Sequence, residues 1–288
     1  MRPTEPFAAI PLLLALALAP PAARAGDAPP FDATPFVGER LTYSVRWNPP
    51  WYMFFLPDME AGELELELAG VDLYRGKPAL RIDLRARSSG ALAKLANMAV
   101  DDRFTFYSDP GTLCAAGGTT RIREGGRKRL LELEYFQDER RLRFRATDEA
   151  ATPPKLQRDV TKDGLPPCVQ DPFSASYLYR TLPLGPGYAK RLVIGNDDKV
   201  MEVDTRIDAR EEVSTPAGRF AAWKVGTDAL KGGLFREGGQ FHVWIAADGS
   251  RAPVKFEAKV RLGHIVGVLK GDSKKSAGGG EGGGEGQE

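Results

Sequence analysis

The stretch that decides the fold is Glu63-Leu64-Glu65-Leu66-Glu67-Leu68, in which acidic and aliphatic side chains alternate strictly. Successive side chains of a β-strand point to opposite faces, so the leucines share one face and the glutamates the other. Leu80-Arg81-Ile82-Asp83-Leu84-Arg85-Ala86-Arg87 repeats the pattern, and residues 70–76 supply turn residues between the two. The pair predicts an antiparallel hairpin with one face on a core.

Similar alternation recurs along most of the chain, which predicts a meander of about a dozen strands. The further candidates are residues 41–47, 103–108, 119–123, 129–136, 140–147, 189–194, 199–209, 221–229, 235–246, 254–260 and 264–269. We therefore expect an all-β, mainly antiparallel fold. It would be a single large curved sheet or a closed or half-open β-barrel, because closure removes exposed edges.

Two segments predict short helices. Asp171-Pro172 combines an N-cap residue with a proline suited to the first turn, and residues 174–182 would complete that helix before Pro183. Residues 89–98 form a second candidate, since Leu92, Leu95 and Ala96 recur at helical spacing. Neither helix is large enough to cover such a sheet.

The two ends of the sequence differ from its middle. Residues 1–25 combine Arg2 with an apolar run and end in Ala23-Arg24-Ala25, which predicts a cleaved signal peptide. We expect residues 26–34 to be an extension, residues 35–270 a single β domain, and the Gly- and Glu-rich residues 271–288 a disordered tail. No segment of the mature chain reaches the ~20 apolar residues of a membrane-spanning helix.

Composition narrows the function classes. Lys and Arg number 40 against 39 Asp and Glu, so no global charge favours nucleic acid. Cys114 and Cys168 permit one disulfide in an oxidising compartment, or two buried thiols. The cysteines lack metal-ligand spacing with His242 and His264, and no P-loop or dinucleotide motif occurs. We expect no metal and no cofactor.

Six blocks, in order, resemble a secreted bacterial family catalogued as domain of unknown function 3108: PFVGERLTYSVRW (35–47), EAGELELEL (60–68), DDRF (101–104), VQDPFSASYLYRTLPL (169–184), STPAGRFAAWKV (214–225) and VWIAADGSRAPVKFEAKVRLGHI (243–265). The resemblance implies a periplasmic, β-rich protein of a Gram-negative cell envelope, with no agreed activity and no catalytic residues. Such proteins join the first two strands by a short turn, whereas this chain inserts residues 48–58. The two cysteines also look specific to this member.

The insertion concentrates apolar side chains between Pro49-Pro50 and Pro57. Proline on both sides favours a constrained loop. At a barrel mouth such a loop could bind a sugar, an acyl chain or a partner, and the alternative is an inward plug of the core. The candidate ligand-binding residues are Trp51, Tyr52, Phe54, Phe55 and the preceding Trp47.

Arginines alternate in Arg121/Arg123 and in Arg141/Arg143/Arg145, so each set faces one side of its strand. Each set could bind phosphate or carboxylate groups. The alternative, which we favour, is an outer face balanced by acids of a neighbouring strand: Glu132, Glu134, Asp138 and Glu139.

For an enzyme, the weak catalytic candidates are Asp102, His242 and Tyr177, which would need to meet in one cleft. We expect instead a periplasmic, non-enzymatic binding or scaffolding protein that engages a lipid-like amphiphile, an envelope glycan or an envelope protein. The alternative is a glycan-active hydrolase or lyase of the cell envelope.

Overall fold

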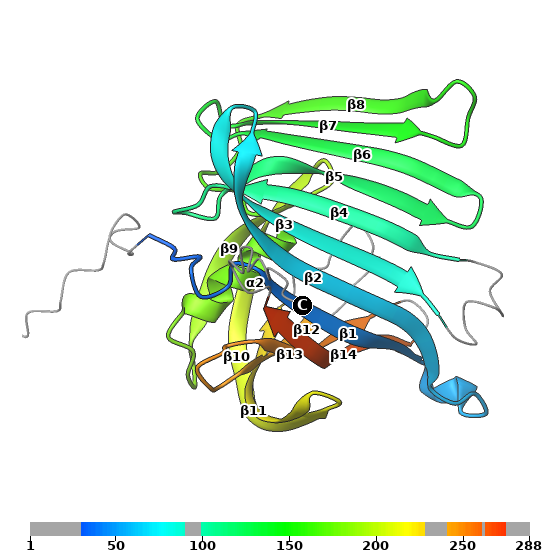
Figure 1. Ribbon diagram of the computed structural model, residues 1–288, viewed down its shortest axis with the longest axis vertical. Helices are drawn as coiled ribbons and strands as arrows, with labels where there is room; N and C mark the ends of the chain where they lie inside the picture. Colours follow the sequence, from blue (N-terminus) through cyan, green and yellow to red (C-terminus); the bar gives the residue numbers. More distant parts are fainter. Residues whose placement is uncertain (1–29, 90–98, 228–240, 261–262, 275–288) are drawn as a thin grey trace, which may run out of the picture. The chain divides into compact units, whose positions relative to one another are not determined.

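The computed structural model describes residues 30–89, 99–227, 241–260 and 263–274. The chain divides into two compact units, Met1–Pro30 and Phe31–Glu288, and all the elements below belong to the second. Its described residues form one antiparallel sheet of 14 strands, one α-helix and one 3-10 helix (Figure 1). The elements are β1 (Glu39–Asn48), η1 (Trp51–Met53), β2 (Met59–Tyr74), β3 (Lys77–Ser88), β4 (Asp101–Ser108), β5 (Ala115–Glu124), β6 (Arg127–Phe136), β7 (Arg141–Asp148), β8 (Lys155–Asp163), α2 (Pro172–Thr181), β9 (Ala189–Asn196), β10 (Lys199–Thr215), β11 (Gly218–Thr227), β12 (Phe241–Ala246), β13 (Pro253–Lys259) and β14 (His264–Lys274).

The β2–β3 hairpin confirms the alternation. Leu66 and Leu68 are buried opposite Leu84 and Ile82, whereas the glutamates between them lie on the other face. Strand β2 continues past Gly70, where the register shifts, so the predicted turn is confined to Arg75 and Gly76. Both turn residues have positive φ, 53° and 77°, which suits a tight hairpin turn between twisted strands.

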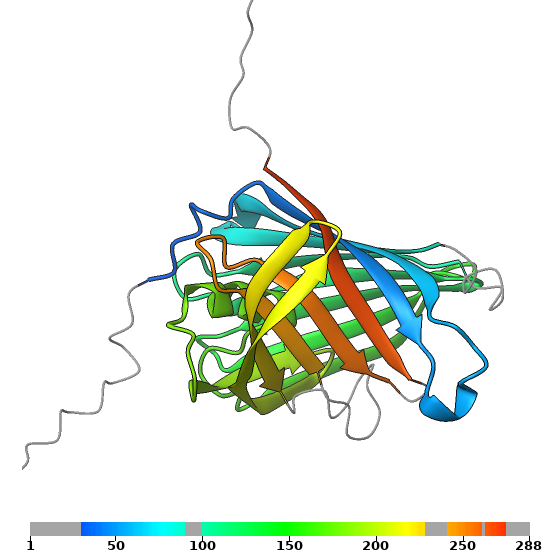
Figure 2. The same cartoon turned by 90° about the horizontal axis from the view of Figure 1, so that it is seen from below.

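The strand order is β8-β7-β6-β5-β4-β3-β2-β1-β14-β13-β12-β11-β10-β9. Each ladder joins strands consecutive in the sequence, except that β1 pairs with β14. The β10–β11 hairpin also reaches β14, where the Ala217 amide donates to the Leu269 carbonyl at 3.2 Å (Figure 2). Strands β8 and β9 are the edges, and the described residues contain no ladder between them. The sheet therefore stays open. Of the predicted forms, the single large curved sheet is confirmed and the closed barrel is not.

Side chains and one connecting segment bridge the two halves of the open sheet. Arg158 of β8 lies 2.6 Å from Asp198, in the turn after β9. The segment before α2 bonds to both halves: the Val169 carbonyl accepts from the Ala115 amide at 2.8 Å, and the Gln170 amide donates to the Val193 carbonyl at 2.8 Å. We call Val169 and Gln170 the seam segment, because they join the start of β5 to β9.

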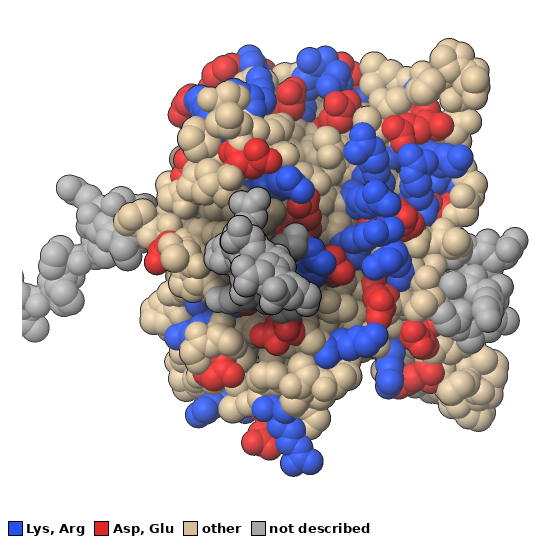
Figure 3. Space-filling view, viewed as in Figure 1, with Lys and Arg blue, Asp and Glu red and all other residues tan. Residues whose placement is uncertain are grey.

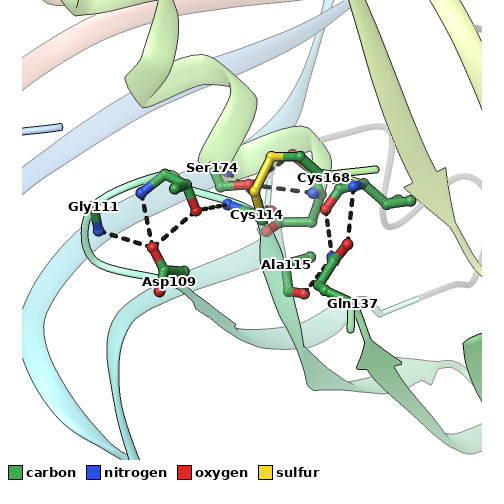
Figure 4. Close-up of a disulfide and its surroundings, with 10 residues drawn as sticks. Asp109, Gly111, Cys114, Ala115, Gln137, Cys168 and Ser174 are labelled. Atoms are coloured by element: carbon green, nitrogen blue, oxygen red, sulfur yellow. Dashed lines mark hydrogen bonds between the residues drawn. A yellow bond between two sulfur atoms is a disulfide. The ribbon is translucent and has the colours of Figure 1, made fainter. Parts of the chain in front are cut away.

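A disulfide between Cys114 and Cys168 fixes the seam segment to β5, with the two Cα atoms 4.8 Å apart (Figure 4). The Gln137 side chain supports the same contact. Its Nε2 donates to the carbonyls of Ala115 at 2.7 Å and Val169 at 2.9 Å. Of the two states left open for the cysteines, the structure has the bonded one.

Helix α2 begins as predicted. The Asp171 side chain accepts from the amides of Phe173 and Ser174 at 2.8 and 2.9 Å, and Pro172 occupies the first turn. Tyr177 packs with Leu41, Leu68 and Ile82 in one core cluster. Ala175 and Tyr179 pack in another, with residues of β9 to β12. The helix therefore fills the space that the curved sheet leaves beside its apolar face.

A buried ion pair joins α2 to β1. Arg180 bonds both carboxylate oxygens of Glu39, with an Nη2 to Oε1 distance of 2.9 Å, and donates to the Ser250 carbonyl at 2.9 Å. The Arg180 and Glu39 side chains are only 2% and 8% exposed. The guanidinium also stacks on the Phe36 ring, 4.2 Å from its centroid. This pair fixes the C-terminal end of the helix against the sheet.

Three points of the fold differ from expectation, and two expected elements fall on residues that are not described. Strand β8 was not predicted, because KLQRDVTKD is almost wholly polar. Strand β14 continues to Lys274, so the sheet extends into the predicted tail. Phe31 and Ala33, placed in an N-terminal extension, pack against the core. The second helix, predicted at residues 89–98, falls almost wholly on residues 90–98, which are not described. The first half of the strand predicted at 235–246 falls on residues 228–240, which are not described either.

Candidate functional site

The inserted loop lies between the end of β1 and the start of β2, where Trp47 is opposite Met59. Pro50 precedes η1, and the Met53 amide donates to the Pro50 carbonyl at 2.8 Å. The Leu56 amide then donates to the Met53 carbonyl at 2.8 Å. Two successive turns thus give the loop backbone a defined conformation, although no side chain of η1 is buried.

The loop presents four aromatic rings to solvent. Trp51 is 87% exposed, Tyr52 52%, Phe54 87% and Phe55 69%. The rings form two edge-to-face pairs, Trp51 with Tyr52 at 5.9 Å and Phe54 with Phe55 at 6.0 Å between centroids. We call these four residues the aromatic loop. Their exposure excludes the alternative in which the insertion plugs the core, and Trp47 is half-buried at its base.

So much exposed aromatic surface is uncommon on a folded domain, which makes the aromatic loop the candidate interaction site of this chain. Burying apolar surface yields about 25 cal/mol per Å². The phenol and indole groups add hydrogen-bonding capacity at a polar boundary. The loop can therefore bind an apolar or amphiphilic surface without any rearrangement of the core.

The three catalytic candidates lie in different places. Asp102 of β4 is buried, and its Oδ1 accepts from the Arg123 amide at 2.7 Å. His242 of β12 lies 3.5 Å from Asp208 and shares a face with Trp244. Tyr177 of α2 is in the core, and burial raises its pKa. Strands β4 and β12 are separated in the sheet by β3, β2, β1, β14 and β13, and no contact joins these three side chains.

Burial nevertheless shifts the pKa values of two of these candidates, the Asp102 carboxyl and the His242 imidazole. Desolvation raises the pKa of Asp102, and the Arg123 amide opposes it. Desolvation also lowers the pKa of His242, with Lys224 adding to the effect and Asp208 opposing it. Each shift has a local structural cause and needs no shared cleft.

Comparison with known proteins gives one family. A family model described as "Protein of unknown function (DUF3108)" matches residues 42–270, which run from β1 to β14. The chain belongs to this family. No curated protein matches the sequence.

Among solved structures, this DUF3108 chain is similar to a β-barrel-like protein of domain of unknown function DUF1849 from Brucella abortus. The two share 10% sequence identity with a TM-score of 0.54, over 84% of this chain and 99% of that chain. This similarity concerns the fold alone.

Two further structures are more distant. One, from Bacteroides fragilis, is described as exported with a YmcC-like fold (14% identity, TM-score 0.30, 83% of this chain and 96% of that chain). The other, from Parabacteroides distasonis, is described as a lipoprotein (11% identity, TM-score 0.25, 83% and 98%).

Two kinds of feature are absent from the described parts of the DUF3108 chain. None of the helices there has the length and apolar character needed to cross a membrane. No group of three or more His, Cys, Asp or Glu side chains there could hold a metal ion.

The His242 environment gives a pH prediction. Because its pKa is lower in the folded than in the unfolded protein, the unfolded chain binds the proton first on acidification. We expect the His242 contribution to stability to be present above about pH 6.5 and to be lost as the pH falls below it. His242→Gln should then show a shallower loss of stability between pH 7.5 and 5.5 in urea denaturation. Identical pH dependence in the two proteins would contradict the assignment.

Proposed function

We propose that this DUF3108 protein is an exported, non-enzymatic binding or scaffolding protein of the periplasm, and that the aromatic loop engages a lipid-like amphiphile. The observation that carries the proposal is the exposure of Trp51, Tyr52, Phe54 and Phe55 on an ordered loop. Two features of the sequence support export: the signal-like residues 1–25 and the pair of cysteines, bonded in the structure.

Amphiphile binding agrees better with the side chains than glycan binding does. Phe54 and Phe55 carry no polar atom with which to orient a sugar hydroxyl. The edge-to-face pairing also leaves the rings of each pair at steep angles, 84° and 81°, and not as one flat stacking platform. An acyl layer needs neither feature, because apolar burial is not directional.

An enzymatic role has less support. Asp102 and Tyr177 are buried, and His242 of β12 lies beside Trp244 of the same strand and Asp208 of β10. A hydrolase or lyase would need an acid and a base on two sides of one substrate.

The test is sedimentation of the full chain with uncharged phosphatidylcholine vesicles. We expect the protein to co-sediment, and Trp51→Ser/Phe54→Ser to reduce binding by at least tenfold, because two exposed rings leave the interface. The matched control is Val71→Ser/Leu73→Ser, which changes two exposed apolar residues near the opposite end of β2.

Equal binding by both double variants and the wild type would overturn the proposal, as would a wild type that stays in solution with both uncharged and anionic vesicles. Sedimentation with purified peptidoglycan provides the competing arm. Loop-dependent binding to that polymer, with none to vesicles, would identify a glycan as the ligand instead.

A further inference from the structure

The strand register places three arginines in one row on the outer face of the sheet. Arg85 of β3 is directly opposite Arg103 of β4, and Arg103 is directly opposite Arg121 of β5. Phe104 and Thr120, which alternate with them, point to the other face. Like charges directly opposite each other destabilise a sheet. Folding alone therefore does not explain this row.

Nearby acids neutralise only part of the row. Asp101 makes a two-point contact with Arg85, at 2.8 and 3.0 Å, and reaches Arg103 at 3.5 Å. Glu65, opposite Arg85, is engaged by Arg40 at 3.4 Å. Among the described residues, Arg121 has no ion pair.

Two more cations extend the row toward the strand ends. Arg123 is opposite Lys128, and its one ion pair within the described part of the chain is with Glu149, at 3.3 Å. We call Arg85, Arg103, Arg121, Arg123 and Lys128 the basic wall. Figure 3 shows Lys and Arg side chains gathered over this part of the sheet.

The arginines of β7 show the opposite arrangement. Arg143 bonds Asp159 of β8 at 2.7 and 3.0 Å, and Arg145 bonds Glu132 of β6 at 2.9 Å. The balanced-face interpretation thus holds for the β7 set and fails for Arg121. The excess positive charge is local to β3, β4, β5 and the start of β6.

The basic wall and the aromatic loop lie at the same end of the sheet. Gly62, close to the start of β2, is opposite Ser88, the last residue of β3, and Asp101, the first of β4, is opposite Arg87. At about 3.3 Å per residue, Arg85, Arg103 and Arg121 lie within about 10 Å of this end. At about 5 Å per strand, β5 lies about 15 Å from β2. One flat surface can contact both features.

We propose that this end of the sheet docks on an anionic lipid bilayer, with the aromatic loop in the headgroup region and the basic wall on lipid phosphates. The inference rests on the proposed function and names the surface that the loop meets. Exposed aromatic rings beside cationic side chains match the two layers of a bilayer surface, apolar below and anionic above. A soluble phosphate ester would use the arginines without the rings.

The test compares phosphatidylcholine vesicles with vesicles containing 30% phosphatidylglycerol, at about 50 mM salt. We expect tighter binding to the anionic vesicles, and a loss of that gain in Arg103→Gln/Arg121→Gln. At about fivefold per arginine, the loss should be on the order of 25-fold. The control Arg143→Gln/Arg145→Gln removes the same charge from paired positions and should lose far less.

The outcomes separate this inference from the proposed function. Loop-dependent binding of equal strength to uncharged and anionic vesicles would contradict a role of the basic wall and leave the proposed function intact. Equal losses of binding in the two arginine variants would do the same. Binding to neither vesicle type, or binding that does not need the loop, would overturn both. If millimolar glycerol phosphate abolished binding to the anionic vesicles, the arginines would bind a free phosphate ester, and docking on a bilayer would be contradicted.

Discussion

Arg180→Ala is expected to lower the free energy of unfolding by about 3–5 kcal/mol, because the change leaves the Glu39 carboxylate buried without its counter-charge. The same substitution removes the donor to the Ser250 carbonyl and the guanidinium that covers Phe36. Urea denaturation at neutral pH, followed by circular dichroism, measures the loss.

Two variants make this test specific. Arg40→Ala removes the neighbouring but partly exposed pair with Glu67, 2.6 Å apart, and should cost less than about 1 kcal/mol. The double variant Glu39→Leu/Arg180→Met removes both buried charges, and should recover most of the stability that Arg180→Ala loses. If Arg180→Ala costs no more than Arg40→Ala, the buried pair does not fix the helix as described.

Loss of the Cys114–Cys168 bond should have an effect of similar size. The bond spans a sequence separation of 54 residues. Constraining a loop of that length in the unfolded chain is worth about 4 kcal/mol in the chain-entropy model. Thermal denaturation of the wild type with and without a thiol reductant, and of Cys114→Ser/Cys168→Ser, measures this difference.

The location of that bond predicts where the reduced protein opens. Amide hydrogen exchange should accelerate first at Ala115, Gln170 and Gly195, whose amides bond across the seam segment. The central amides of β2 and β3 provide an internal control and should stay protected. Reductant should not affect the double serine variant. Uniform acceleration over the whole sheet would show that the bond stabilises the fold without closing the seam.

The sequence predicts local structure well where one physical signal dominates. Strict alternation locates β2 and β3, and the Asp171-Pro172 cap locates the start of α2. Strand β8 has no comparable signal, since as an edge strand it buries almost nothing and its polar residues read as a loop. Its pairing comes from backbone bonds to β7, which composition does not encode.

The candidate sites depend on tertiary relations that a single sequence does not contain. Its aromatic and proline content singles out residues 49–57, but the orientation of the rings depends on the strands that support them. Alternation alone identifies Arg121 as facing one side of its strand. Its position opposite Arg103 follows only from the register between β4 and β5, and a shift of one residue would reverse the faces.

Among the described strands, β1 and β14 form the one ladder between strands distant in the sequence, and this ladder constrains how the chain assembles. During synthesis the N-terminal strands emerge first, and β2 to β8 can each pair with a neighbour that has just been made. One edge of β1 has to wait for β14, which is made more than 200 residues later. Until then its free amides can recruit another molecule. Arg40 and Arg46 on that strand are charges that discourage such pairing, so β1 carries its own protection against aggregation while it waits.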